Sequence, residues 1–131
     1  MEGNVVPFAR RAESSVLVVE DDPSQLEELV EVVRSFGWSA AGVSDGYAAV
    51  AAIRQGRPKL VILDIRLPAI DGIRVLEFAQ SLGFSGQVVL ISGDPDALRR
   101  AMQSSTNPIS ILEKPVSTKV LGELLYAILS A

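Results

Sequence analysis

The spacing of four short apolar runs constrains the fold of this chain more than any other feature of its sequence. Each run is rich in valine, leucine or isoleucine, and segments long enough to form helices separate one run from the next. The runs are Val16–Val19, Leu60–Leu63, Val88–Ile91 and Ile109–Leu112. Such runs are typical of parallel strands that are buried on both faces of a sheet. The sequence therefore predicts an α/β fold with a doubly wound parallel sheet.

A shorter strand at residues 38–43 and a set of helix signals complete this pattern as five rounds of strand and helix. Aspartate caps the first turn of a helix, and proline fits the first helical position. The expected caps are Asp22, Asp45, Asp71 and Asp94, and the expected helix stops are Gly37, Gly56 and Gly83. Gln25 is expected to close a capping box with Asp22.

The length of 131 residues indicates a single domain. Residues 1–14 are polar, small and aperiodic, and are expected to be a tail or linker, while residues 15–131 form the domain. Hydrophobic residues make up 48% of the chain, which suits a sheet covered on both faces and argues against disorder.

Two missing residue types exclude several kinds of site. The chain has no cysteine and no histidine, so it has no disulfide framework, no thiol nucleophile, no Ser-His triad and no phosphohistidine of its own. Its net charge of −4 gives no basic surface for nucleic acid. No apolar run approaches the roughly 18 residues of a membrane span, and no secretory signal begins the chain. We expect a cytoplasmic protein.

Acidic residues follow two of the apolar runs. Glu20 and Asp21 come directly after the first run, and Asp64 comes directly after the second. Because the carboxyl ends of parallel strands meet at one edge of the sheet, we expect the three carboxylates to lie together. Such a cluster needs a cation, and oxygen ligands without histidine or cysteine favour Mg²⁺. The alternative is that Asp21 and Asp22 only cap a helix, which leaves Asp64 unexplained.

A lysine and a serine follow the other two runs. Lys114 lies between Glu113 and Pro115 at the end of a strand, where its ammonium could pair with Asp64 and with a phosphoryl oxygen. Ser92 follows its strand directly, and its hydroxyl could bond a phosphoryl oxygen. The alternatives are an ordinary surface lysine and a solvated loop serine. Ser92 is not expected to be a nucleophile, because the chain has no histidine to activate it.

These residue types together predict covalent carboxylate chemistry. Asp64 would attack a phosphoryl donor in line and form an acyl phosphate, while the metal and Lys114 neutralise the phosphoryl oxygens. The chain has no glycine-rich phosphate loop ending in Gly-Lys-Ser or Gly-Lys-Thr, so a nucleotide is not the expected donor.

The order of the motifs resembles the receiver domain of bacterial two-component response regulators, over about residues 15–131. The matching segments are VLVVEDD (Val16–Asp22), SDG (Ser44–Gly46), VILDIRLPAIDG (Val61–Gly72), VLISG (Val89–Gly93) and LEKP (Leu112–Pro115). The resemblance implies a flavodoxin-like five-stranded parallel sheet in the order 2-1-3-4-5, with helices on both faces.

The resemblance also implies a role for each site residue. Asp64 would be the phosphoacceptor, Ser92 the switch hydroxyl and Lys114 the phosphate-sensing lysine, followed by a cis bond to Pro115. The metal ligands would be Glu20, Asp21, Asp64 and the backbone carbonyl of Arg66. The phosphoryl group would come from a histidine kinase, a histidine phosphotransfer protein or a small phosphodonor.

Two features bear on how the expected switch is read out. Members of the family often have an aromatic residue three positions before the lysine, where this chain has Ile111, which has no ring to rotate. The last expected helix, at residues 117–129, carries more apolar residues than one buried face requires. The excess suggests a homodimer or an output domain contacting the fourth and fifth helices; the alternative is a helix buried on two faces.

Several functions share these motifs. The chain could be a free-standing regulator, the terminal receiver of a hybrid histidine kinase, or a receiver cut from a regulator with an output domain. A phosphatase of the haloacid dehalogenase type also forms an aspartyl phosphate, but it places a second aspartate where this chain has Arg66. A pseudo-receiver would be expected to lack Asp64 or Lys114. We therefore expect a phosphoacceptor that catalyses only its own phosphorylation and dephosphorylation.

The loops beside the expected acceptor carry one further pair of charges. Arg66 lies two residues after Asp64, and Asp94 lies two residues after Ser92. We expect the two side chains to pair over the site and to slow hydrolysis of the acyl phosphate. The alternative is that both point to solvent and that Asp94 only caps a helix.

Overall fold

A computed structural model describes residues 15–130 and shows five parallel strands alternating with five helices. The strands are β1 (Val16–Val19), β2 (Ala40–Val43), β3 (Leu60–Asp64), β4 (Gln87–Ser92) and β5 (Ser110–Glu113). The helices are α2 (Pro23–Ser35), α3 (Gly46–Gly56), α4 (Gly72–Ser81), α5 (Pro95–Gln103) and α6 (Thr118–Leu129). The expected tail at residues 1–14 lies outside the described residues.

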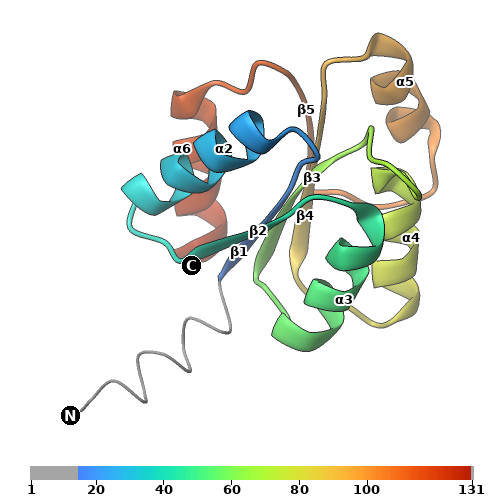
Figure 1. Ribbon diagram of the computed structural model, residues 1–131, viewed down its shortest axis with the longest axis horizontal. Helices are drawn as coiled ribbons and strands as arrows, with labels where there is room; N and C mark the ends of the chain where they lie inside the picture. The colour runs from blue at the N-terminus through green and yellow to red at the C-terminus, as the bar shows by residue number, and fades with distance from the viewer. Residues whose placement is uncertain (1–14, 131) are drawn as a thin grey trace.

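The strand order is β2-β1-β3-β4-β5, and every neighbouring pair is parallel. Helices α2 and α6 cover one face of the sheet, and α3, α4 and α5 cover the other (Figure 1). The doubly wound sheet and its order are therefore confirmed.

Side chains of the central strands alternate between two hydrophobic clusters, as the pleat of a strand requires. On β1, Leu17 and Val19 belong to the cluster under α3, α4 and α5, whereas Val16 and Val18 belong to the cluster under α2 and α6. Strands β3 and β4 follow the same rule. Burial on both faces explains why these strands are continuous apolar runs with no polar alternation.

The expected aspartate caps are present at four helices. The side chains of Asp22, Asp45, Asp71 and Asp94 accept hydrogen bonds from backbone N–H groups in the first turns of α2, α3, α4 and α5. Gly37 and Gly83 follow the ends of α2 and α4 with positive φ, as expected of helix stops.

Two local predictions are wrong. Gly56 is the last residue of α3 and does not stop it; the left-handed position falls one residue later on Arg57, at φ 44°. Gln25 also does not close a capping box, because the backbone N–H of Asp22 donates to Glu20 Oε2 at 3.1 Å. Helix α2 keeps the Asp22 cap, but a glutamate that precedes the helix satisfies the second N–H.

The apolar excess of the last helix is mostly buried. Leu121, Leu125 and Leu129 are buried, and Leu124 and Ile128 pack partly against the same cluster. Tyr126 remains 73% exposed. Packing against both the sheet and α2 therefore accounts for most of the stripe, as in the alternative of a helix buried on two faces.

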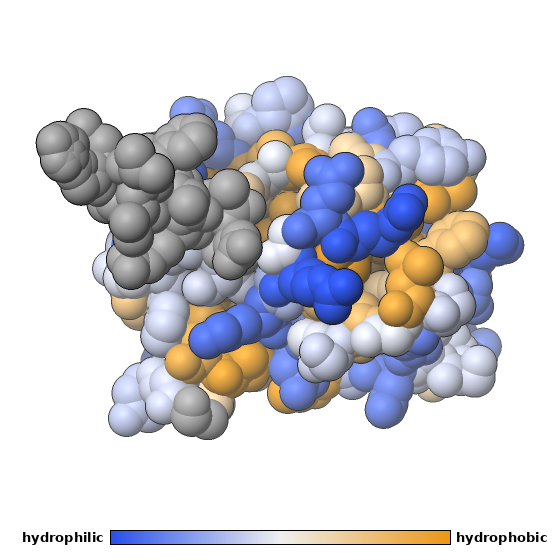
Figure 2. All heavy atoms as spheres, turned by 90° about the horizontal axis from the view of Figure 1, so that it is seen from below, coloured by the Kyte–Doolittle hydropathy of each residue, from blue (hydrophilic) through white to orange (hydrophobic). Residues whose placement is uncertain are grey.

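The two edges of the sheet differ in character. The strands begin at the lower edge, where Figure 2 shows strongly hydrophilic side chains gathered between patches of apolar surface. Arg54, Arg57 and Lys59 are exposed at this end, where α3 ends and β3 begins. The acidic residues singled out by the sequence lie at the opposite edge, where the strands end.

Candidate phosphoryl-transfer site

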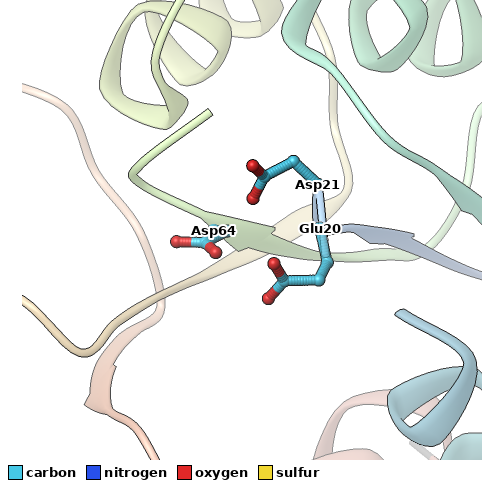
Figure 3. Close-up of side chains that lie close together, drawn as sticks. All are labelled: Glu20, Asp21 and Asp64. Carbon is cyan, nitrogen blue, oxygen red and sulfur yellow. The ribbon is translucent and has the colours of Figure 1, made fainter. Parts of the chain in front are cut away.

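Three carboxylates meet where β1 and β3 end. One oxygen each of Glu20, Asp21 and Asp64 lies within 4.8 Å of the other two, and the three side chains surround a common space (Figure 3). The pairing of Val19 with Leu63 across the sheet brings Glu20 level with Asp64. The register of two buried strands thus places the cluster.

Glu20 and Asp64 are nearly removed from solvent, with 1% and 3% of their surfaces exposed, whereas Asp21 is exposed. A buried carboxylate is stable only when it is paired and hydrogen-bonded. Asp64 Oδ1 accepts from the backbone N–H of Arg66 at 3.1 Å, and both oxygens of Glu20 accept hydrogen bonds. No buried side-chain oxygen or nitrogen in residues 15–130 lacks a partner.

The side chain of Lys114 reaches the cluster from the end of β5. Its Nζ lies 2.7 Å from Glu20 Oε1, 2.8 Å from Asp64 Oδ2 and 2.9 Å from Gln25 Oε1. Burial acts to lower the pKa of Lys114, but the hydrogen bonds and negative charges of Asp64 and Glu20 outweigh it and raise that pKa above its usual value. The ammonium therefore stays charged at neutral pH.

A charge count shows what this arrangement can hold. Three carboxylates and one ammonium leave two negative charges uncompensated at the site. The donors are all oxygens, one from each carboxylate within 4.8 Å of the others, and this donor set suits a hard divalent cation. Glu20, Asp21 and Asp64 would therefore hold an ion such as Mg²⁺, which would supply the missing positive charge.

Ser92 ends β4 and is fully buried. Its Oγ accepts a hydrogen bond from the backbone N–H of Asp94 at 3.0 Å, which leaves the hydroxyl proton to donate elsewhere. The backbone N–H of Lys114 donates to the carbonyl of Ser92 at 2.9 Å, so these two residues leave the sheet side by side. The bond between Lys114 and Pro115 is cis.

Arg66 and Asp94 form an ion pair between the loops that follow β3 and β4. Asp94 also caps α5 through its other carboxylate oxygen, so the pairing and the capping occur together. The N–H of Asp96 lowers the pKa of Asp94, partial burial opposes this, and the Arg66 guanidinium adds to the lowering. Asp94 is therefore ionised and available to Arg66 at neutral pH.

Gln25 is the site residue that the sequence did not identify. It lies on the exposed first turn of α2, 89 residues from Lys114 in the chain. Val18 and Ile62, two residues before Glu20 and Asp64, face the cluster under α2 and α6. Leu112, two residues before Lys114, packs against the same cluster. The same alternation directs Glu20, Asp64 and Lys114 toward α2, where Gln25 contacts Lys114.

The model of the response regulator receiver domain family matches residues 16–126. The chain belongs to this family. It is 35% identical over 107 residues to the DNA-binding response regulator MtrA of Mycolicibacterium smegmatis, a match that covers 81% of this chain and 46% of MtrA. The chain thus spans about half the length of this relative.

Solved structures agree with the fold. The receiver domain of a signal transduction histidine kinase from Syntrophus aciditrophicus matches with a TM-score of 0.79 and 26% identity, covering 89% of this chain and 90% of that one. The receiver domain of the sensor histidine kinase PA1611 from Pseudomonas aeruginosa PAO1 matches with a TM-score of 0.81 and 23% identity, covering 90% and 98%. In residues 15–130 no helix is both long and apolar enough to cross a membrane.

Proposed function

We propose that Asp64 accepts a phosphoryl group and that its phosphorylation switches the binding of partners by this receiver domain. One observation carries the proposal: the carboxylate of Asp64 ends a buried central strand between an ammonium and two further carboxylates. Of its two neighbouring strands, β1 ends one residue before Glu20 and β4 ends at Ser92, so groups suited to metal and phosphoryl oxygens flank it. A carboxylate that only capped a helix would not need these neighbours.

We propose Mg²⁺ as the cofactor, held by Glu20, Asp21, Asp64 and the backbone carbonyl of Arg66. The two uncompensated negative charges and the all-oxygen donor set support it. When bound, the ion would supply positive charge to the phosphoryl oxygens as transfer proceeds. The PA1611 receiver domain, which shares this fold, was solved with a magnesium ion coordinated in its active-site cleft.

In the proposed reaction, a carboxylate oxygen of Asp64 attacks the phosphorus of the donor. A P–O bond to Asp64 forms, the bond from phosphorus to the donor nitrogen or oxygen breaks, and the leaving group keeps the electron pair. Lys114 then donates an N–H to a phosphoryl oxygen, and Ser92 donates its hydroxyl proton to another. Both groups stabilise the acyl phosphate without entering covalent chemistry.

The proposed donor is a histidine kinase, a histidine phosphotransfer protein or a small phosphodonor. We propose that the chain catalyses only its own phosphorylation and dephosphorylation. The side chain two residues after Asp64 is the guanidinium of Arg66, which is paired with Asp94 and offers no acidic proton to the leaving group of an external substrate.

The proposed readout lies on α5 and α6, where a homodimer or an output domain would bind. Exposed apolar side chains on this side support it: Met102, Ile109 and Tyr126 are 67%, 46% and 73% exposed. Ile111 is half-buried against the cluster under α5, so an aliphatic residue would transmit the change.

We further propose residues 15–131 as the receiver, a cytoplasmic location, and no nucleic-acid binding by this chain.

Mass spectrometry after incubation with acetyl phosphate and Mg²⁺ tests the assignment. We expect one phosphoryl group on Asp64, none on the Asp64→Asn variant, and weaker Mg²⁺ binding by Asp21→Ala. Asp45→Asn is the matched control, because Asp45 caps α3 and does not belong to the carboxylate cluster. Undiminished labelling of Asp64→Asn would remove Asp64 as the acceptor.

A further inference from the structure

All three N–H donors of the Lys114 ammonium are occupied. They reach Glu20 Oε1 at 2.7 Å, Asp64 Oδ2 at 2.8 Å and Gln25 Oε1 at 2.9 Å. An ammonium has three donors and no acceptor. Lys114 therefore has no N–H left for a phosphoryl oxygen and must give up one of these contacts to bind one.

Gln25 has no competing task in the first turn of α2. The N–H that a capping glutamine would normally satisfy, that of Asp22, already donates to Glu20 Oε2. The backbone N–H of Gln25 completes the Asp22 cap at 3.0 Å. Its side-chain oxygen is thus directed across the groove to Lys114 and not back to its own helix.

The three acceptors of Lys114 are unequal. Glu20 and Asp64 are buried carboxylates, and each forms an ion pair with Lys114 in surroundings that screen charge weakly. Gln25 is uncharged and exposed, so its contact is the weakest of the three and water readily replaces it. The amide is the acceptor that Lys114 loses at least cost.

We propose that Gln25 is a positioning residue that holds Lys114 in its resting place and competes with the phosphoryl group for one N–H of that lysine. The proposal rests on the function assigned to Asp64 and Lys114. It makes the first turn of α2 part of the switch, because the amide must be released when Lys114 turns to a phosphoryl oxygen. Gln25 thereby sets the balance between the resting and phosphorylated states.

The surroundings of Gln25 permit this release. Gln25 and Lys114 both line an open groove of about 490 Å³ between α2 and the segment that leads into α6. Gln25 is exposed on the first turn of α2, so its side chain has room to rotate within the groove. The switch contact can therefore break without disturbing the core.

Binding of beryllofluoride with Mg²⁺, a mimic of the acyl phosphate, tests the proposal. Gln25→Met keeps the length of the side chain but removes the acceptor, and we expect about two- to fivefold tighter binding, the effect of one modest hydrogen bond. Gln25→Glu adds a charge that holds Lys114 and repels the anion, so we expect weaker binding by at least a similar factor. Glu28→Gln, in the same groove, is the control and should bind as the wild type does.

The ¹⁵N signal of the Lys114 ammonium, measured without metal or beryllofluoride, gives a second readout that a loss of helix stability would not produce. We expect faster exchange of its protons with water in Gln25→Met than in wild type or Glu28→Gln. If wild type binds beryllofluoride but Gln25→Met binds it no more tightly, with the Lys114 signal unchanged, Gln25 has no positioning role. If wild type itself does not bind, the function assigned to the site fails first, and this inference fails with it.

Discussion

Arg66 donates a hydrogen bond to Asp94 and joins the loop that follows β3 to the loop that follows β4. The side chains are 65% and 30% exposed, so solvent screens the pair and it contributes little to stability. Its importance lies in its position, because Arg66 follows Asp64 by two residues and Asp94 follows Ser92 by two. Because these loops flank the site, we expect water that hydrolyses an acyl phosphate on Asp64 to approach past them.

We predict that the phosphoryl group is long-lived because this pair restricts the approach of water. Arg66→Ala and Asp94→Ala should each lose the phosphoryl group about two- to fivefold faster, which corresponds to less than about 1 kcal/mol in the barrier. The measurement is the decay of phosphorylated protein in Mg²⁺ after removal of the donor.

The double variant distinguishes the pair from two independent effects. If the residues act together, Arg66→Ala with Asp94→Ala should decay no faster than either single variant. Asp94→Asn keeps an oxygen that can cap α5 and removes the charge that pairs with Arg66, so it controls for damage to the helix. Unchanged decay in Arg66→Ala would show that the ion pair does not restrict the approach of water.

We predict that Lys114→Ala remains folded but no longer couples phosphorylation to partner binding. Loss of the ammonium leaves Glu20 and Asp64 buried without their cation, which should cost about 1–3 kcal/mol of unfolding free energy. Added Mg²⁺ should restore more stability to this variant than to wild type, because the variant carries one more uncompensated charge. Thermal unfolding with and without Mg²⁺ measures whether the variant stays folded and how much stability the ion restores.

The loss of coupling in Lys114→Ala is measured as the change in partner affinity that phosphorylation produces. A Lys114→Ala protein that shows the full change despite the missing ammonium would mean that Lys114 is not the sensor. Lys119→Ala, one helical position into α6 and exposed, is the matched control for loss of a positive charge.

The raised pKa of Lys114 predicts a specific loss of stability in alkali. Because the folded-state pKa lies above the unfolded value of about 10.4, the stabilisation is fully present below that pH and is lost as pH rises through the folded-state pKa. The unfolding free energy of wild type should therefore fall more steeply above pH about 10.4 than that of Lys114→Met. Equal slopes for wild type and Lys114→Met would contradict a raised pKa of Lys114. Lys59→Met, which removes an exposed lysine, is the control.

The sequence predicted the parts of this structure that depend on near neighbours. Buried parallel strands are readable as apolar runs, and aspartate caps are readable because the cap and its N–H partners lie within three residues. The strand order required the resemblance to a known family, since the runs themselves do not specify which strands pair. The sequence also places carboxylates at strand ends, but their separation depends on the register of β1 with β3.

What the sequence missed depends on contacts between distant residues. Gln25 has a plausible local role in a capping box, and only the folded sheet brings Lys114 within 2.9 Å of it. Arg57 takes a left-handed conformation beside Gly56, against the local preference for glycine. For the N–H of Asp22, the local rule assigned Gln25, but Glu20 accepts that hydrogen bond instead. Nothing in the structure explains why Arg57 and not Gly56 takes the left-handed position.

Two glycines beside the site predict opposite sensitivities to alanine. A Cβ on Gly72 would lie 2.4 Å from the carbonyl oxygen of Asp64 and 2.9 Å from the Cα of Ile65, so the backbone after β3 would have to move. A Cβ on Gly93 would meet only the Cβ of Lys114, at an ordinary 3.8 Å. We expect Gly72→Ala to lower the unfolding free energy by about 2–4 kcal/mol, and Gly93→Ala to change it by less than about 0.5 kcal/mol.

Binding of beryllofluoride should reveal a defect in Gly93→Ala that its stability does not show. Gly93 lies beside Ser92, and the space that its missing side chain leaves is expected to admit the phosphoryl group. Gly93→Ala should therefore bind beryllofluoride more weakly than wild type at nearly unchanged stability, as measured by denaturant unfolding and by titration with Mg²⁺ present. Full affinity in Gly93→Ala would show that the phosphoryl group does not use this space, whereas weaker binding at equal stability would place it between Ser92 and Lys114.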